Sequence, residues 1–140
     1  MRTVSTPVTV TRTGSSTFTA SNDRGGRVTI AHEDAEDGFT PGELLLAAIA
    51  GCAQLTSENL LTRRLGQRAP VTVHADRELD ERDPDRFGSV RLSFDVDLSG
   101  VGDVTERAKL VEAVERAIAR KCTVSRSVEH GTPVEISLPG

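Results

Sequence analysis

Two cysteines, Cys52 and Cys122, carry the most reactive side chains in this sequence of 140 residues. The chain begins MRTVSTPVTVTRTG, without the apolar core of a secretion signal, so we expect a cytoplasmic protein. In that compartment two cysteines do not form a structural disulfide framework. They are therefore free thiols, metal ligands or a redox pair. His32, His74 and His130 lie in separate segments without ligand spacing, so we expect no metal site.

The two cysteines have different local surroundings. Cys52 lies in an apolar run, and burial among apolar groups raises the pKa of a thiol. Cys122 follows Arg120 and Lys121 at an expected helix start, where a thiolate is favoured. Local sequence thus favours Cys122 as the more reactive thiol; for Cys52 to react as a thiolate, residues remote in sequence would have to activate it.

Cys52 lies in the middle of a long predicted helix, Thr40 to Gln67. Thr40 and Glu43 form a Thr-x-x-Glu capping box, and Gly66 occupies an expected C-cap. The run from 44 to 53 is apolar on every face, so protein must surround it. The other elements of one chain supply only part of that cover. We expect a second copy of the same helix, in a homodimer, to supply the rest; the alternative is a monomer that buries the helix with its own sheets.

Alternating and helical patterns place the remaining elements around this helix. Strands are expected at 7–13, 17–20, 27–31, 71–79, 87–98 and 134–138, and helices at 103–121 and 122–128. In the final strand Val134, Ile136 and Leu138 alternate with polar residues. The order βββ–α–ββ–αα–β predicts an α+β fold in a single domain, 1–140.

Composition excludes several functional classes. A net charge of −4, a pI near 5.4 and dispersed basic residues argue against nucleic acid as the main partner. No uninterrupted apolar run approaches the ~18 residues that span a membrane, so no membrane partner is expected.

The two cysteine segments, ELLLAAIAGC at 43–52 and KCTVSRSV at 121–128, resemble the motifs of the osmotically induced protein C (OsmC) and organic hydroperoxide resistance (Ohr) family. The seventy residues between the cysteines and the Asn22–Gly26 turn also fit that pattern. The resemblance implies an intertwined homodimer with two sheets around a pair of long antiparallel helices. It also implies an OsmC-like cysteine-based peroxidase, active in the oxidative stress response as an antioxidant.

The same resemblance assigns roles to individual residues. It makes Cys52 the peroxidatic cysteine and Cys122 the resolving one, and it implies Glu43 as a glutamate that holds an activating arginine. Glu43 lies nine residues before Cys52, as in OsmC-like branches, whereas the Ohr pattern places its glutamate one residue earlier, where this chain has Gly42. The hairpin turn that would carry the arginine reads Gly-Ser-Ser-Thr, so three nearby candidates remain: Arg12, Arg24 and Arg27.

The expected function is thiol-dependent reduction of organic hydroperoxides or hydrogen peroxide. No bound cofactor is needed; an external dithiol, such as a lipoylated protein, would restore the thiols. The alternative is a dimeric binding protein of the same fold for a small hydrophobic ligand, with redox-idle cysteines.

The position of Glu43 predicts a shared active site. Nine residues along a helix amount to a rise of ~13.5 Å and half a revolution, so Glu43 and Cys52 of one chain lie on opposite faces. If Glu43 assists catalysis, it therefore acts on the partner chain's cysteine or through an arginine. The alternative is a purely structural role, in which Glu43 only caps its helix.

Overall fold

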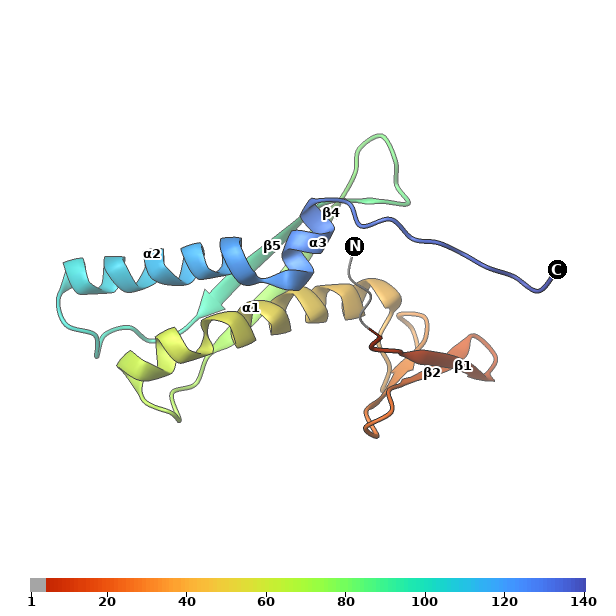
Figure 1. The fold of residues 1–140 in the computed structure, drawn as a ribbon, viewed down its shortest axis with the longest axis horizontal. Helices are drawn as coiled ribbons and strands as arrows, with labels where there is room; N and C mark the ends of the chain where they lie inside the picture. The colour runs from red at the N-terminus through yellow and green to blue at the C-terminus, as the bar shows by residue number, and fades with distance from the viewer. Residues whose placement is uncertain (1–4) are drawn as a thin grey trace. The chain divides into compact units, whose positions relative to one another are not determined.

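The computed structural model describes residues 5–140, which form an α+β fold (Figure 1). By its internal contacts the chain divides into two compact units, one ending at Leu45 and one beginning at Leu46, and each is described by itself. The single domain over 1–140 stays a prediction. The elements are β1 (Thr9–Gly14), β2 (Thr17–Ser21), β3 (Arg27–Ile30), α1 (Pro41–Leu65), β4 (Thr72–Leu79), β5 (Phe87–Asp95), α2 (Val104–Lys121) and α3 (Thr123–Glu129).

The first unit is the predicted meander of three strands. β1 pairs antiparallel with β2, and β2 with β3. The β2–β3 turn is closed by the Asn22 side chain, whose Oδ1 accepts hydrogen bonds from the backbone N–H groups of Arg24 (3.0 Å) and Gly26 (2.9 Å). Gly25 has a φ of +91°, which glycine adopts without the steric penalty of a Cβ atom.

Helix α1 begins and ends where its caps predict. The backbone N–H of Thr40 donates to Glu43 Oε1 (2.8 Å), and the backbone N–H of Glu43 donates to Thr40 Oγ1 (3.1 Å). This is the reciprocal pair of a capping box. At the other end Gly66 has a φ of +99°, typical of a helix C-cap.

Only one stripe of α1 is buried within the chain. It consists of Leu46, Ile49, Ala53, Ser57 and Leu61, which recur every three or four residues. The apolar residues between them, such as Ala47, Ala48 and Leu55, stay exposed. The chain alone therefore covers one face of a helix that is apolar on several.

In the second unit, α1, α2 and the loop before α2 enclose the core. Leu61, Val101, Leu110 and Val114 form a buried cluster. Partly buried residues such as Phe94 of β5 pack against it. β4 and β5 form a two-stranded antiparallel hairpin beside these helices (Figure 1).

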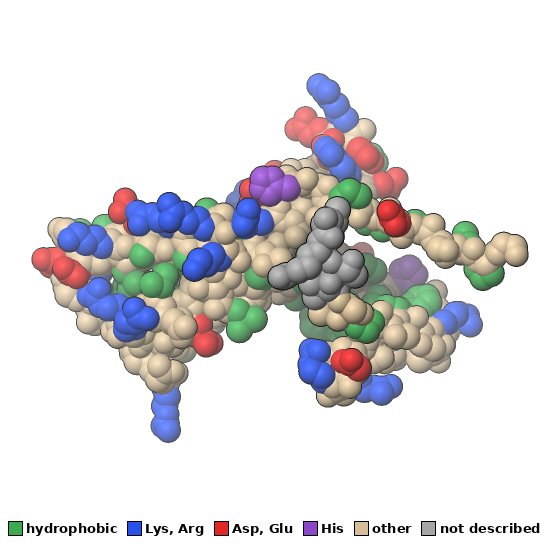
Figure 2. All heavy atoms as spheres, viewed as in Figure 1, with side chains coloured by type: hydrophobic (Ala, Val, Ile, Leu, Met, Phe, Trp, Pro, Cys, Tyr) green, Lys and Arg blue, Asp and Glu red, His purple; other side chains and the backbone are tan. Residues whose placement is uncertain are grey.

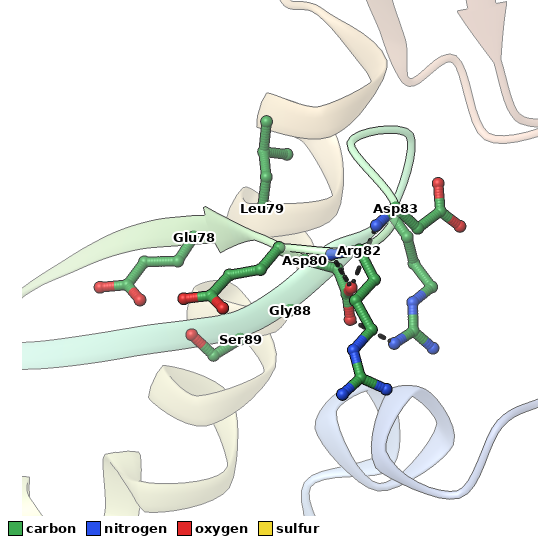
Figure 3. A pocket seen from close by; sticks show the side chains of 9 residues that line it. Glu78, Leu79, Asp80, Arg82, Asp83, Gly88 and Ser89 are labelled. Atoms are coloured by element: carbon green, nitrogen blue, oxygen red, sulfur yellow. Dashed lines mark hydrogen bonds and ion pairs between the residues drawn. The ribbon is translucent and has the colours of Figure 1, made fainter.

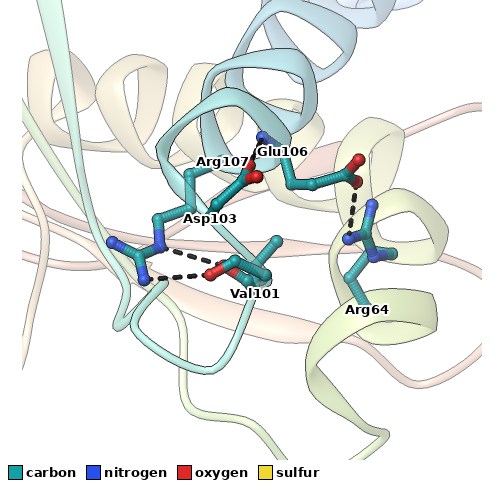
Figure 4. A network of polar contacts seen from close by, with 6 residues as sticks. Arg64, Val101, Asp103, Glu106 and Arg107 are labelled. Atoms are coloured by element: carbon teal, nitrogen blue, oxygen red, sulfur yellow. Dashed lines mark hydrogen bonds and ion pairs between the residues drawn. The ribbon is translucent and has the colours of Figure 1, made fainter.

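Local hydrogen bonds fix the start of α2 (Figure 4). Asp103 is its N-cap, and its side chain accepts from the backbone N–H of Glu106 (2.9 Å). Arg107 donates back to three carbonyls of the preceding loop, those of Val101 (2.9 Å), Gly102 (3.1 Å) and Ser99 (3.4 Å). This clamp holds Val101 in the core. Along α2, Lys and Arg side chains cover the surface seen in Figure 2, as an amphipathic helix requires.

The predicted C-terminal strand is wrong for a single chain. Within the described residues, 132–140 pair with no strand, and Val134, Ile136 and Leu138 are 83, 83 and 82% exposed. The alternation is typical of a strand, but a strand also needs a neighbour with free backbone groups. No strand within residues 5–140 supplies that neighbour, although the α+β class itself is confirmed.

Helix α1 is also long and apolar enough, by length and composition alone, to cross a membrane. Of its most apolar 18-residue window, 28% is buried. Counting only uninterrupted apolar residues in the sequence does not identify this helix. A mean hydropathy over 18 residues can be high even when a few of them are polar. The indication is weak, since the core helix of a soluble protein has the same length and composition.

Candidate active site

The two cysteines come from separate elements of the second unit. Cys52 lies in the middle of α1 and is half-buried. Cys122 is the single residue between α2 and α3, and its exposed fraction is 0%. Both are free thiols.

The backbone around Cys122 is firmly held. Its φ of −71° and ψ of 96° end α2 and begin α3. Its N–H donates to the carbonyl of Ile118 (3.0 Å), and its carbonyl accepts from the N–H of Arg126 (3.0 Å). The Arg126 guanidinium donates to the carbonyl of Arg120 (2.8 Å), tying the start of α3 to the end of α2. The turn therefore presents the Cys122 thiol in a fixed place.

The Cys122 thiol is one of four groups that lower the pKa of the Cys52 thiol. Partial burial raises the pKa of Cys52, but four hydrogen bonds lower it by more, so the pKa lies below its ordinary value of 9.0. The donors are the backbone of Val124, the Cys122 thiol, the Thr56 hydroxyl and the backbone of Thr123. Each stabilises the thiolate by donating to a negatively charged sulfur.

This arrangement corrects one expectation and supports another. The apolar run predicts a raised pKa for Cys52, and burial does raise it, but the hydrogen bonds prevail. Three of the four donors lie some seventy residues downstream, so most of the groups that lower the pKa of Cys52 are remote in sequence.

Sequence reasoning missed Thr56, Thr123 and Val124. The spacing of four residues between Cys52 and Thr56 was an available signal, because residues i and i+4 are neighbours on a helix. The backbone groups of Thr123 and Val124 leave no such signal, because any residue type except proline supplies an N–H.

The remaining predicted residues belong to the first unit. Glu43 makes the capping contact described above, and its catalytic role stays a prediction. Arg12 lies on β1, Arg24 forms an exposed ion pair with Asp23 (3.8 Å), and Arg27 begins β3. Their role at Cys52 also stays a prediction.

The second unit also has two hollows that neither cysteine lines. One, of about 650 Å³, is polar and lies at the β4–β5 turn (Figure 3). Its centre is Asp80, which accepts from the Arg86 guanidinium (2.6 Å) and from the backbone N–H groups of Arg82 (2.9 Å) and Asp83 (3.2 Å). These bonds, with that of Arg86 the largest influence, lower the pKa of Asp80. These hydrogen bonds give Asp80 a structural role in the β4–β5 turn. The other hollow, of about 510 Å³, is apolar and lies between β5 and α2.

Comparison with known proteins identifies the class. Residues 32–137 match the family model described as OsmC-like protein. The chain belongs to the OsmC-like family.

Relatives and solved structures agree with this assignment. Uncharacterised proteins of Mycobacterium tuberculosis and Mycobacterium bovis are 35% identical over 133 residues, covering 95% of this chain and 96% of theirs. The crystal structure of an OsmC-like protein from Mycoplasma pneumoniae shares the fold, with a TM-score of 0.69, 16% identity and coverage of 92% of this chain and 89% of that one. A Psychrobacter arcticus structure, named for osmotic stress induction and a detoxification response, has a TM-score of 0.64, 20% identity and coverage of 91% and 90%.

Proposed function

We propose that this protein is a thiol-dependent peroxidase that reduces organic hydroperoxides or hydrogen peroxide through Cys52 and Cys122. The observation that carries the proposal is the pair itself: a half-buried Cys52 whose pKa is lowered in part by a second, fully buried thiol, that of Cys122. A peroxidatic cysteine needs thiolate character, access and a resolving thiol nearby.

The proposed cycle has three steps. The Cys52 thiolate attacks one oxygen of the peroxide; an S–O bond forms, the O–O bond breaks, and the departing oxygen takes up a proton to leave as alcohol or water. The resulting sulfenic acid is attacked by the Cys122 sulfur, which gives a disulfide and releases water. An external dithiol, for example a lipoyl group, then reduces the disulfide to two thiols and becomes a disulfide itself.

We also propose that the working form is a cytoplasmic homodimer. The exposed face of α1 supports this: a Cβ atom built on Gly51 would meet nothing within 4 Å, and Leu55 is 77% exposed. Small residues let a second helix approach closely, and an exposed leucine gains from being covered. The unpaired tail 132–140, with its exposed alternating apolar residues, supports the same assembly because a partner sheet would give it a neighbour.

A steady-state assay tests the enzymatic proposal. Peroxide consumption with dithiothreitol is expected for the wild type and lost in Cys52→Ser. Cys122→Ser serves as the matched control: it keeps one rapid turnover per site, because the first step needs only Cys52. Peroxidase activity that survives in Cys52→Ser, with the fold intact by circular dichroism, would overturn the proposal.

The apolar hollow favours a second candidate function, the binding of a small hydrophobic ligand. It is lined by apolar side chains that include Leu92, Phe94, Val114 and Ile118, with Glu115 and Glu129 as its charged members. Under this alternative the cysteines are redox-idle. Binding of an apolar fluorescent probe that Val114→Trp blocks, together with absence of peroxide turnover in the wild type, would favour the alternative.

A further inference from the structure

We propose that Arg126 is a positioning residue for the resolving step, because its guanidinium holds the junction between α2 and α3 in the bent form that carries Cys122. The inference rests on the proposed disulfide between Cys52 and Cys122. It adds to that disulfide a residue that acts through the backbone of the junction.

The bend lies at Cys122 itself. Its ψ of 96° is far from the helical value of about −42°, so α2 ends there and α3 starts in another direction (Figure 1). The backbone N–H of Cys122 makes the last bond of α2, to the carbonyl of Ile118 (3.0 Å). The carbonyl of Cys122 accepts the first bond of α3, from the backbone N–H of Arg126 (3.0 Å). One residue thus terminates one helix and starts the next.

The bend deprives a carbonyl of α2 of its helical partner. In an unbroken α-helix the carbonyl of Arg120 would accept from the backbone N–H four residues later, that of Val124. The extended conformation of Cys122 excludes that bond, and the Arg126 guanidinium donates to the Arg120 carbonyl instead (2.8 Å). The Arg126 side chain therefore replaces a hydrogen bond of the straight form and offsets part of the cost of the bend.

The local sequence does not force this bend. Proline and glycine are the residues that most often break or kink a helix, and residues 104–130 contain neither. The same residues are compatible with one continuous helix. The bent form therefore depends on contacts across the junction, and the bond from Arg126 to the Arg120 carbonyl is one of them.

Straightening would also remove backbone groups from the site. In a continuous helix the N–H groups of Thr123 and Val124 would donate to the carbonyls four residues before them. In the bent form they start α3 and have no acceptor within that helix. The lowered pKa of Cys52, to which both backbone groups contribute, agrees with this difference.

The bend matters most after the first oxidation. A sulfenic acid at Cys52 has two fates. The Cys122 sulfur attacks it, which forms the disulfide and releases water, or a second peroxide transfers an oxygen to it, which forms sulfinic acid and releases alcohol or water. The first fate requires the junction to hold Cys122 in place, whereas the second depends on the peroxide concentration. Loss of the Arg126 bond therefore shifts the products towards sulfinic acid.

Two measurements on Arg126→Met test the inference, because methionine removes the donor and keeps an unbranched side chain. The first treats the reduced protein with rising peroxide and compares, by intact mass, the molecules that lost two hydrogens with those that gained two oxygens. The second equilibrates the protein with reduced and oxidised dithiothreitol and needs no peroxidase activity. Arg126→Lys restores a cationic donor, and Arg116→Met, at an exposed arginine of α2, is the matched control.

The expected result is the same shift in both measurements. In Arg126→Met the peroxide concentration that converts half of the protein to sulfinic acid falls about fivefold, the size of one hydrogen bond. The equilibrium constant for forming the disulfide against dithiothreitol falls by a similar factor, because the two thiols have a lower effective concentration. Arg126→Lys recovers most of both values, and Arg116→Met changes neither.

The outcomes separate the inference from the proposed function. Unchanged products and an unchanged equilibrium in folded Arg126→Met refute the role of Arg126 and leave the peroxidase proposal intact. A shifted equilibrium in a protein that consumes no peroxide supports the role of Arg126 and refutes the peroxidase. A wild type that forms no disulfide between Cys52 and Cys122 with oxidised dithiothreitol overturns both. If Arg126→Met does not fold, Arg126→Gln is measured and judged by the same equilibrium.

Discussion

Replacing Leu55 tests whether the exposed face of α1 is the interface between two copies. The side chain is 77% exposed in the single chain, although leucine is among the most apolar residues. Full burial of a leucine side chain contributes about 1.5–3 kcal/mol, so covering the exposed part contributes roughly 1–2 kcal/mol per copy.

Symmetry doubles this contribution. In a two-fold dimer both copies of Leu55 lie at the interface, so Leu55→Ala weakens association by roughly 2–4 kcal/mol. That corresponds to a dissociation constant about 30- to 1,000-fold higher. Leu55→Arg is expected to abolish the dimer, because it also buries an unpaired charge of each copy in the interface.

Sedimentation equilibrium over a range of concentrations measures the effect. Val104→Ala is the matched control, because Val104 is 75% exposed but lies at the start of α2. A wild type that is monomeric, or a Leu55→Arg variant that stays as dimeric as the wild type, would refute the reasoning about α1.

Three further predictions concern the thiol, the clamp and the shared site. Because the pKa of Cys52 in the folded protein is lowered from 9.0, alkylation of Cys52 has its midpoint at a lower pH than in the unfolded chain, and an equal midpoint in urea would contradict this. By the same linkage the Cys52 thiolate stabilises the fold above the unfolded pKa, and this stabilisation is lost as the pH falls through the folded pKa. Arg107→Met removes three hydrogen bonds, of which only that to Val101 is part-buried, so urea unfolding is expected to show a loss of about 1–2 kcal/mol, against no change for the exposed Arg116→Met. If Glu43 acts on the partner's cysteine, Cys52→Ser refolded together with a poorly active Glu43→Ala regains activity, since one site of each mixed dimer has both groups; no gain over the separate variants leaves Glu43 as a helix cap.

Local signals in the sequence were sufficient for most of the fold. The limits of α1 depend on Thr40, Glu43 and Gly66, which act within a few residues of themselves, and the structure confirms them. The turn at Asn22 is equally local. The tail 132–140 shows the limit of such signals, because alternation predicts the strand but does not identify its partner.

The proximity of the two cysteines was predictable from the sequence, but the electrostatics of Cys52 were not. The two motifs point to Cys52 and Cys122, and the structure brings them together. The direction of the Cys52 pKa depends on whether burial or hydrogen bonding prevails, and two of the donors are backbone groups of Thr123 and Val124. Only the folded chain brings those groups to Cys52.

The most direct test of the central claim is the product of one oxidation. The reduced protein receives one equivalent of peroxide, and its peptides are analysed by mass spectrometry without reduction. The peroxidase account predicts loss of two hydrogens and a crosslinked peptide that joins Cys52 to Cys122 within one chain. A crosslink between chains, or overoxidised Cys52 beside an untouched Cys122, would contradict it.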